Sequence, residues 1–250
     1  MKKTLKDVLV ICNLDNALMT PAQEILSCNV EMVRLFCTLG GRFTIATART
    51  LSSTKEVLKD LCINAPVAVC GGGMVVDWES EQVLQKHCLD SQTALQLIQD
   101  VQSRFPDTGI EIVDDMGKVL VLQSSAYTNE HIIRENLECI YQPLEDMQSP
   151  WTKIVFTDSS KMLQRISAFV ADRNYFQLQP VFTNHIYYEI MPEKATKGNA
   201  LKTICQKIGF PLENTVAIGD YYNDMELLKT AGYAVAMGNA PSEVKLIADQ

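Results

Sequence analysis

Histidine is scarce in this sequence, with three residues, and the eight cysteines form no Cys-x-x-Cys pair. Structural zinc sites need Cys or His ligands at short, fixed spacings, so we expect no such site. Cys12 ends an apolar run, which is typical of a buried free thiol in a reducing cytoplasm. The apolar run after the basic N-terminus stops at Asn13, too soon for a signal peptide or a membrane span. We therefore expect a cytoplasmic protein without a membrane partner.

Basic residues are also fewer than acidic ones. The chain has 22 Lys and Arg residues against 30 Asp and Glu residues, for a formal net charge of −8. A surface of this sign repels nucleic acid, so we expect no nucleic-acid partner. It also repels phosphate esters, so an anionic ligand would need a local cation. The 250 residues, 47% of them hydrophobic, suffice for one large domain or for a core with an inserted domain.

Strand and helix patterns alternate in the first third of the chain. Residues 7–12 form a continuous apolar run that is typical of a strand buried on both faces of a parallel sheet. Residues 20–23 resemble a helix start with Pro21 at the first helical position, and Gly40 and Gly41 would end that helix. A second strand at 42–46, a helix at 54–61 and a strand at 66–69 follow. This order predicts a doubly wound parallel sheet.

The same alternation returns near the C-terminus. We expect strands at 187–190, 215–218 and 234–236 and helices at 197–208, 223–230 and 242–248. Between them the pattern changes to a hairpin, 109–113 with 118–122, and helices at 91–105 and 161–170. We therefore predict an α/β protein with a Rossmann-like core of residues 1–77 and 185–250 and an inserted α/β domain of residues 78–184. The three glycines at 71–73 indicate either a hinge or a tight turn at a strand end.

Four polar segments follow predicted strands or open a helix: residues 12–18, 46–49, 197–198 and 218–224. Open α/β sheets bind ligands at the carboxyl ends of their strands. Taken singly, each segment has an ordinary explanation. Asp15 could cap a helix, Lys197 could be a solvated lysine, and the last segment has common turn residues. Their shared placement at one edge of the sheet favours a binding site.

The residue types in these segments fit a phosphate site. Asp15, Asp220 and Asp224 offer the hard oxygen atoms that Mg²⁺ prefers. Thr47 offers a hydroxyl group and backbone N–H groups. Lys197 offers a positive charge at a helix N-terminus, where the helix dipole also favours an anion. Mg²⁺ and Lys197 would supply the positive charge that the rest of the chain lacks.

The four segments resemble motifs one to four of the haloacid dehalogenase superfamily, and most closely those of its Cof-type sugar-phosphate phosphatases. The most specific stretches are residues 217–225 with 231–240, and 189–192 with 196–198. The resemblance covers essentially the whole chain and puts residues 78–184 in the position of the cap that covers the substrate. It implies an acid/base role for Asp15, a magnesium site and a phosphate site. The implied magnesium ligands are Asn13, Asp15, Asp220 and Asp224, and the implied phosphate-binding residues are Thr47, Lys197 and Asn223.

The first motif departs from the family pattern Asp-x-Asp-Gly-Thr, because it reads Asn13-Leu14-Asp15-Asn16-Ala17. The first Asp of the family attacks phosphorus, and an amide is a poor nucleophile. Asn13 could still offer a neutral oxygen to Mg²⁺. Two hypotheses remain: an Mg²⁺-dependent phosphatase of small phosphorylated metabolites that works weakly or by direct attack of water, or a non-catalytic protein that binds a phosphorylated ligand or a partner. The sequence indicates neither the substrate nor the oligomeric state.

Overall fold

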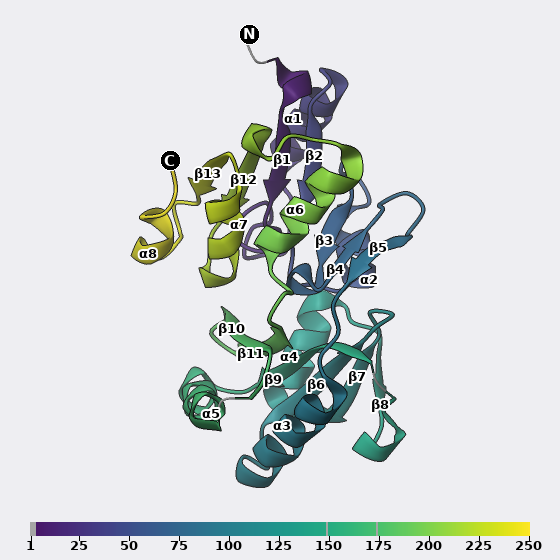
Figure 1. Cartoon of the computed structure of the whole chain (residues 1–250), viewed down its shortest axis with the longest axis vertical. Coiled ribbons are helices and arrows are strands. Elements are labelled where there is room, and N and C mark those ends of the chain that lie inside the picture. Colours follow the sequence, from purple (N-terminus) through teal and green to yellow (C-terminus); the bar gives the residue numbers. More distant parts are fainter. Residues whose placement is uncertain (1–3, 149, 174) are drawn as a thin grey trace. The chain divides into compact units, whose positions relative to one another are not determined.

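The computed structural model describes residues 4–148, 150–173 and 175–250, and the chain divides into two compact units (Figure 1). Unit 1 consists of Met1–Arg49, Thr54–Gln85 and Thr196–Gln250, and unit 2 consists of Thr50–Ser53 and Lys86–Ala195. The division therefore falls after Gln85 and after Ala195. The predicted boundaries, after residues 77 and 184, lie too early at both places.

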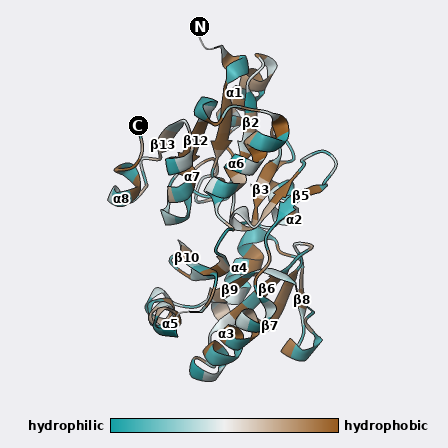
Figure 2. Ribbon diagram, viewed as in Figure 1, coloured by the Kyte–Doolittle hydropathy of each residue, from teal (hydrophilic) through white to brown (hydrophobic). Residues whose placement is uncertain are grey.

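The main sheet of unit 1 has four parallel strands in the order β13-β12-β1-β2. Their bounds are Leu9–Cys12 for β1, Arg42–Ile45 for β2, Thr215–Gly219 for β12 and Tyr233–Ala236 for β13. Strand β3 (Val67–Val69) adjoins β2 through a parallel bridge between Ala46 and Ala68. The strands are among the most hydrophobic segments of the unit (Figure 2). The predicted doubly wound parallel sheet is confirmed, and the strand order reverses between β1 and β12.

Helices complete the core of unit 1. They are α1 (Ser27–Thr38), α2 (Leu51–Leu58, whose first residues belong to unit 2), α6 (Lys197–Ile208), α7 (Met225–Thr230) and α8 (Ser242–Lys245). Short 3-10 turns lie at η1 (Leu5–Asp7), η2 (Cys70–Gly72), η4 (Leu212–Asn214) and η5 (Tyr222–Asp224). Fully buried side chains from the sheet and from α6 and α7 form one cluster that includes Leu9, Ile11, Leu201, Ile204, Ala217 and Leu227.

Helix α1 begins at Ser27 rather than at the predicted start near Thr20. The amide of Thr20 donates a hydrogen bond to the Glu24 carbonyl oxygen at 2.9 Å, and Met19 forms a β-bridge with Ile25. Gln23 has a left-handed φ of 64°, which a helix excludes. The residues before Ser27 therefore close a loop, so the Thr-Pro pattern marks a turn here and not a helix start.

The glycines at 71–73 form a tight turn within unit 1, so the hinge alternative is wrong. They connect β3 to the antiparallel strand β4 (Met74–Val76) through η2. Gly72 has a φ of +94°, and a Cβ atom there would lie 2.4 Å from the carbonyl oxygen of Thr196. Glycine is required because it tolerates this φ and lets the turn pack against the first residues of α6.

Unit 2 is built on a six-stranded sheet of order β10-β11-β9-β6-β7-β8. Neighbouring strands are antiparallel except β7 and β8, which are parallel, and the predicted hairpin is confirmed as β6 and β7. The strands are β6 (Gly109–Asp114), β7 (Val119–Gln123), β8 (Cys139–Tyr141), β9 (Trp151–Thr157), β10 (Leu178–Asn184) and β11 (Tyr187–Pro192). The helices are α3 (Ser91–Arg104), α4 (Ala126–Glu135) and α5 (Ser160–Arg173), with a 3-10 turn at η3 (Leu144–Asp146).

Strand β11 corrects the sequence prediction, which assigned residues 187–190 to the parallel core. It lies between β9 and β10 and is antiparallel to both. All six of its residues are buried, so its pattern is the same as that of a core strand of a parallel sheet. At the other boundary, β5 (Val83–Lys86) joins β4, and the Thr203 hydroxyl of α6 donates to Gln85 Oε1 at 2.7 Å. Residues 78–85 therefore belong to unit 1.

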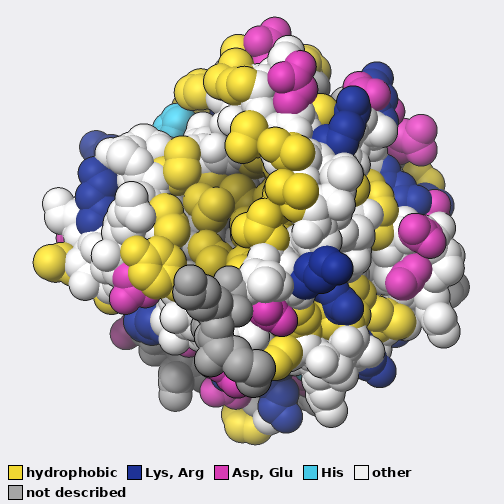
Figure 3. Space-filling model, turned by 90° about the horizontal axis from the view of Figure 1, so that it is seen from above, with side chains coloured by type: hydrophobic (Ala, Val, Ile, Leu, Met, Phe, Trp, Pro, Cys, Tyr) yellow, Lys and Arg dark blue, Asp and Glu magenta, His cyan; other side chains and the backbone are white. Residues whose placement is uncertain are grey.

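The surface shows no gathering of basic side chains on the face in Figure 3, where acidic and basic residues are interspersed around a hollow lined by hydrophobic ones. Helix α1 contributes exposed apolar side chains, with Met32 at 62% and Leu35 at 48% exposure. Among the helices in the described parts of the chain, none combines the length and the hydrophobicity that a membrane span requires.

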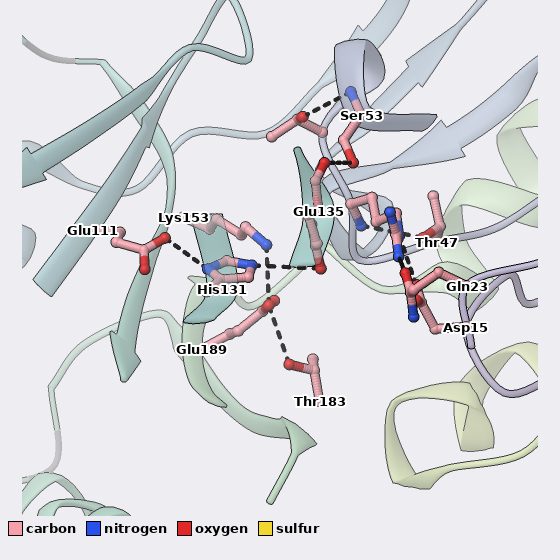
Figure 4. Close-up of polar contacts among 12 residues, drawn as sticks. Asp15, Gln23, Thr47, Ser53, Glu111, His131, Glu135, Lys153, Thr183 and Glu189 are labelled. Carbon is pink, nitrogen blue, oxygen red and sulfur yellow. Dashed lines mark hydrogen bonds and ion pairs between the residues drawn. The ribbon is translucent and has the colours of Figure 1, made fainter. Parts of the chain in front are cut away.

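A buried charged cluster lies on the opposite face of the unit 2 sheet from its apolar core. The imidazole of His131 lies 2.8 Å from Glu111 Oε2 and 3.4 Å from Glu135 Oε1 (Figure 4). Its ring also contacts that of Tyr187, with 4.4 Å between centroids. Burial lowers the pKa of His131, but the charges of Glu111 and Glu135 outweigh it and raise the pKa to about 10.

This cluster predicts a pH-dependent stability for unit 2. The folded-state pKa of His131 exceeds its unfolded value of about 6.5, so its stabilisation is complete below that pH and is lost as the pH rises through about 10. We expect the free energy of unfolding to fall over this range in a Trp78→Phe background, where buried Trp151 reports urea unfolding. The fall should be smaller with His131→Gln. Equal pH dependences in the two proteins would contradict the assignment.

Candidate functional site

The site lies at the carboxyl ends of the unit 1 strands, and Asn13 is at its centre. The backbone N–H of Asn13 donates to the Ile218 carbonyl oxygen at 2.8 Å, which extends the pairing of β1 with β12. This register brings the side chain of Asn13, 5% exposed, next to that of Asp220. Asn13 Nδ2 donates to Asp220 Oδ1 at 2.7 Å and to the backbone oxygen of Asp15 at 2.9 Å.

Lys197 supplies the buried cation of the site. It is the first residue of α6, whose N-cap residue Thr196 accepts a hydrogen bond from the Asn199 amide. Its ammonium donates to Asn13 Oδ1 at 2.9 Å and to Asp224 Oδ1 at 2.6 Å. The side chains of Lys197 and Asp224 are 1% and 0% exposed. An ammonium has three donors, so two of them are engaged in these hydrogen bonds.

Asp224 also holds the loop after β12 in place. Its Oδ2 atom accepts hydrogen bonds from the backbone N–H groups of Asp220 and Tyr221, at 2.9 and 3.1 Å. One oxygen of this carboxylate therefore faces the loop and the other faces Lys197. Helix α7 follows directly, and a Cβ atom at Gly198 would lie 2.4 Å from the Glu226 carbonyl oxygen. This close contact packs the start of α6 against α7.

The carboxyl group of Asp220 has an unusual electrostatic environment. Burial and the negative charge of Asp224 raise its pKa to about 6, against the lowering effects of Asn13, Lys197 and Asn239. Its second oxygen, Oδ2, accepts a hydrogen bond from Asn239 Nδ2 at 3.2 Å. Asn239 lies in the stretch 231–240 that carries the family resemblance, and the sequence predicted no role for it.

Asp15 forms a bidentate ion pair with Arg49, at 2.9 Å from Nε to Oδ2 and 2.7 Å from Nη2 to Oδ1 (Figure 4). Arg49 is 1% exposed and also donates to Gln23 Oε1. The backbone N–H of Arg49 donates to Thr47 Oγ1 at 3.1 Å. Arg49 and Gln23 were not predicted. The signal available for Arg49 was its place in the same strand-end segment as Thr47.

The departures in the first motif leave the loop intact. Asn16 takes a φ of 58°, a conformation that asparagine tolerates better than most residues. Its backbone oxygen accepts a hydrogen bond from Asn239 Nδ2 at 3.2 Å. Asn16 can therefore stand where the family pattern has a glycine.

The structure brings most of the predicted residues together. Asn13, Asp220, Lys197 and Asp224 form one continuous hydrogen-bonded network. Asn223 stands apart, since its buried Oδ1 atom has no hydrogen-bond partner among the described residues. The phosphate-binding role of Asn223 stays a prediction.

The predicted magnesium ligands do not fit a magnesium site in this arrangement. Arg49 faces both oxygens of Asp15, and the oxygens of Asp224 face Lys197 and the loop amides. Asn13 turns its nitrogen, not its oxygen, toward Asp220. No group of three or more His, Cys, Asp or Glu residues in the described parts of the chain could hold a metal ion.

Comparison with known proteins gives one consistent result. A sequence model of haloacid dehalogenase-like hydrolases matches residues 10–250. Pyridoxal phosphate phosphatase YbhA of Escherichia coli strain K12 is 25% identical over 247 residues, which cover 95% of this chain and 90% of the relative. The 5-amino-6-(5-phospho-D-ribitylamino)uracil phosphatase YcsE of Bacillus subtilis strain 168 is 23% identical over 244 residues, 96% and 88% of the two chains.

Solved structures agree on the fold. The crystal structure of a haloacid dehalogenase-like hydrolase from Bacteroides thetaiotaomicron has a TM-score of 0.85 to this chain at 24% identity. The match covers 97% of this chain and 92% of the other. Both units of the chain therefore have counterparts in a known architecture.

Proposed function

Because the chain belongs to the haloacid dehalogenase-like hydrolases, we propose that its unit 1 site binds the phosphoryl group of small phosphorylated metabolites and hydrolyses their esters slowly at most. The membership also confirms the resemblance predicted from the four strand-end motifs. The proposal is supported by the network of Lys197, Asn13 and Asp220, in which a buried cation lies next to an amide at the position where the family has its attacking carboxylate.

Lys197 and Thr47 are the residues proposed to hold the phosphoryl group. Lys197 combines its charge with the N-terminal end of the twelve-residue helix α6, and both favour an anion. Thr47 follows β2 with its side chain fully buried at the same edge of the sheet. Such positioning and electrostatic contacts account for most of the catalysis of phosphoryl transfer.

The substrate class proposed for this chain follows the relatives. The names of the Escherichia coli and Bacillus subtilis proteins specify phosphatases of pyridoxal phosphate and of a phosphorylated ribitylaminouracil. Both substrates are small phosphate monoesters, and we propose that class here. Unit 2 occupies the sequence position of the family's cap, and we propose that it determines the specificity for particular esters of this class.

Slow hydrolysis in this site would proceed by direct attack of water. The water oxygen bonds to phosphorus, the ester P–O bond breaks, and one proton of the water passes to the departing alkoxide. Asp15 is the residue proposed to move that proton. Its ion pair with Arg49 must first open, because both carboxylate oxygens face the guanidinium.

A second candidate function is phosphate-ligand binding without turnover. It is favoured by the position of Asn13, whose amide carbonyl oxygen is a weak nucleophile and is hydrogen-bonded to Lys197. The two candidates share the ligand and differ only in whether phosphate is released.

A test of the proposal uses the native chain and a matched variant, Thr47→Val, which keeps the shape of the side chain and removes its hydroxyl group. Calorimetry with pyridoxal 5′-phosphate and with sugar phosphates should show binding, whereas pyridoxal and the free sugars should not bind. We expect Thr47→Val to weaken binding at least about fivefold, the effect of losing one hydrogen bond of about 1 kcal/mol. Equal binding of phosphorylated and unphosphorylated compounds would contradict the proposal.

A further inference from the structure

The Asn13 amide group has one oxygen and one nitrogen, and the surrounding atoms determine which way each faces. On one side stands the ammonium of Lys197, which only donates hydrogen bonds. On the other side stand the Asp15 backbone oxygen and Asp220 Oδ1. A backbone oxygen can only accept hydrogen bonds, and so can both oxygens of Asp220 when its carboxyl group is ionised. The observed orientation, with Oδ1 toward Lys197 and Nδ2 toward the two oxygens, satisfies every contact.

The reversed orientation fails on both sides. It would place the Nδ2 hydrogens against the Lys197 ammonium and would leave Oδ1 against two acceptor oxygens. A hydrogen-bonding group left without a partner in a buried position is costly, and Asn13 is 5% exposed. The orientation of the amide is therefore fixed by its neighbours and does not depend on one contact alone.

An aspartate at position 13 would behave differently. A carboxylate has two oxygens, so one could accept a hydrogen bond from Lys197 while the other joined the Asp15 backbone oxygen and Asp220 around a cation. Asn13 has a single oxygen, and Lys197 occupies it. The amide nitrogen then donates to the Asp15 backbone oxygen and to Asp220 Oδ1, so a cation cannot contact these two oxygens from the position of the nitrogen.

The balance of charged side chains around the site also disfavours a divalent cation. Three carboxylates, Asp15, Asp220 and Asp224, face two cations, Arg49 and Lys197, across the site. Aspartate at position 13 would add a fourth carboxylate and leave an excess of two negative charges, which one divalent cation would neutralise. Asparagine removes one of those charges, so the electrostatic demand for a divalent cation is smaller.

We infer that the Asn13 amide nitrogen replaces Mg²⁺ as the group that bridges the Asp15 backbone oxygen and Asp220, so that this chain binds the phosphoryl group of its ligand without a divalent metal. The identity of the ligand, a phosphoryl group, rests on the proposed function. The statement that no divalent metal is bound rests on the geometry around Asn13 alone.

The test measures Mg²⁺ binding by calorimetry in four proteins: the native chain, Asp220→Asn, Asn13→Asp, and Asn13→Asp with Asp220→Asn. We expect the native chain and Asp220→Asn to bind Mg²⁺ equally weakly. Asn13→Asp should bind it at least about tenfold more tightly, or about 1.4 kcal/mol, and the added Asp220→Asn change should remove that gain. Mg²⁺ binding by the native chain that Asp220→Asn weakens about tenfold would overturn the inference.

Orthophosphate binding provides the second measurement, in Mg²⁺ and in EDTA. The native chain should bind orthophosphate with affinities that agree within about twofold in the two conditions, whereas Asn13→Asp should bind it more tightly in Mg²⁺. A native affinity that falls tenfold or more in EDTA, about 1.4 kcal/mol, would overturn the inference. Absence of orthophosphate binding in both conditions would refute the proposed function and the metal-free phosphate binding. If Asn13→Asp does not fold, the native chain and Asp220→Asn still decide the metal question.

Discussion

Asn13→Asp should raise the rate of aryl phosphate hydrolysis in Mg²⁺ at least about tenfold over the native chain, a fall of roughly 1.4 kcal/mol in the activation barrier. The substitution replaces an amide by a carboxylate that can attack phosphorus. The rest of the site is already arranged around this position, with Lys197 at 2.9 Å and Asp220 at 2.7 Å from the side chain. Initial rates of phosphate release, at saturating and at low substrate, measure the change.

Two controls make this result specific. Adding Asp15→Asn to Asn13→Asp should abolish the gain, because the carboxylate proposed to move the proton is then lost. Asn13→Ser, which offers neither a carboxylate nor an amide, should show no gain over the native rate. If Asn13→Asp is as inactive as the native chain, the non-catalytic candidate function replaces the enzymatic one. Brisk turnover by the native chain would show that another residue attacks.

Lys197→Met should produce the largest loss of stability among substitutions at the site. The side chains of Lys197 and Asp224 are 1% and 0% exposed, and removal of the lysine leaves the carboxylate of Asp224 without its cation. Breaking a buried ion pair in this way costs about 3–5 kcal/mol, so the free energy of unfolding in urea should fall by that amount. The cost comes mainly from the uncompensated charge, not from the loss of packing.

The matched control is Lys197→Met combined with Asp224→Asn. The double variant removes both charges and should recover at least about 1 kcal/mol relative to Lys197→Met alone, since the two residues are directly coupled. Both variants should lose binding of orthophosphate. If the double variant is no more stable than the single one, the ion pair contributes less than its burial implies.

The parallel core could be predicted because its strands are short, continuously apolar and followed by polar residues. The same reasoning failed for β11, since a strand covered on both faces has one pattern in parallel and antiparallel sheets. Helix α1 was predicted to begin too early, because Thr20 and Pro21 occur in turns as well as at helix starts. The left-handed φ of Gln23 has no signature in the sequence.

The site could be predicted to the level of its residue types. Asn13, Lys197, Asp220 and Asp224 meet because parallel strands place their carboxyl ends at one edge of the sheet. The ion pair of Asp15 with Arg49 was not predicted, since an arginine two residues after Thr47 has many possible partners. The direction of the Asn13 amide could not be predicted at all. It depends on which atoms lie on each side of the side chain, and only the folded structure gives them.

In the arrangement that we infer, the Asn13 amide faces Lys197 with its oxygen and takes the position of a metal with its nitrogen. A crystal structure of the native chain with Mn²⁺ and orthophosphate, using the anomalous signal of manganese, tests this most directly. We predict phosphate beside Lys197 and Thr47, and no manganese between Asn13, Asp15 and Asp220. A manganese ion in that position, at a coordination distance of roughly 2.0–2.3 Å from Asn13 Oδ1, would contradict the claim.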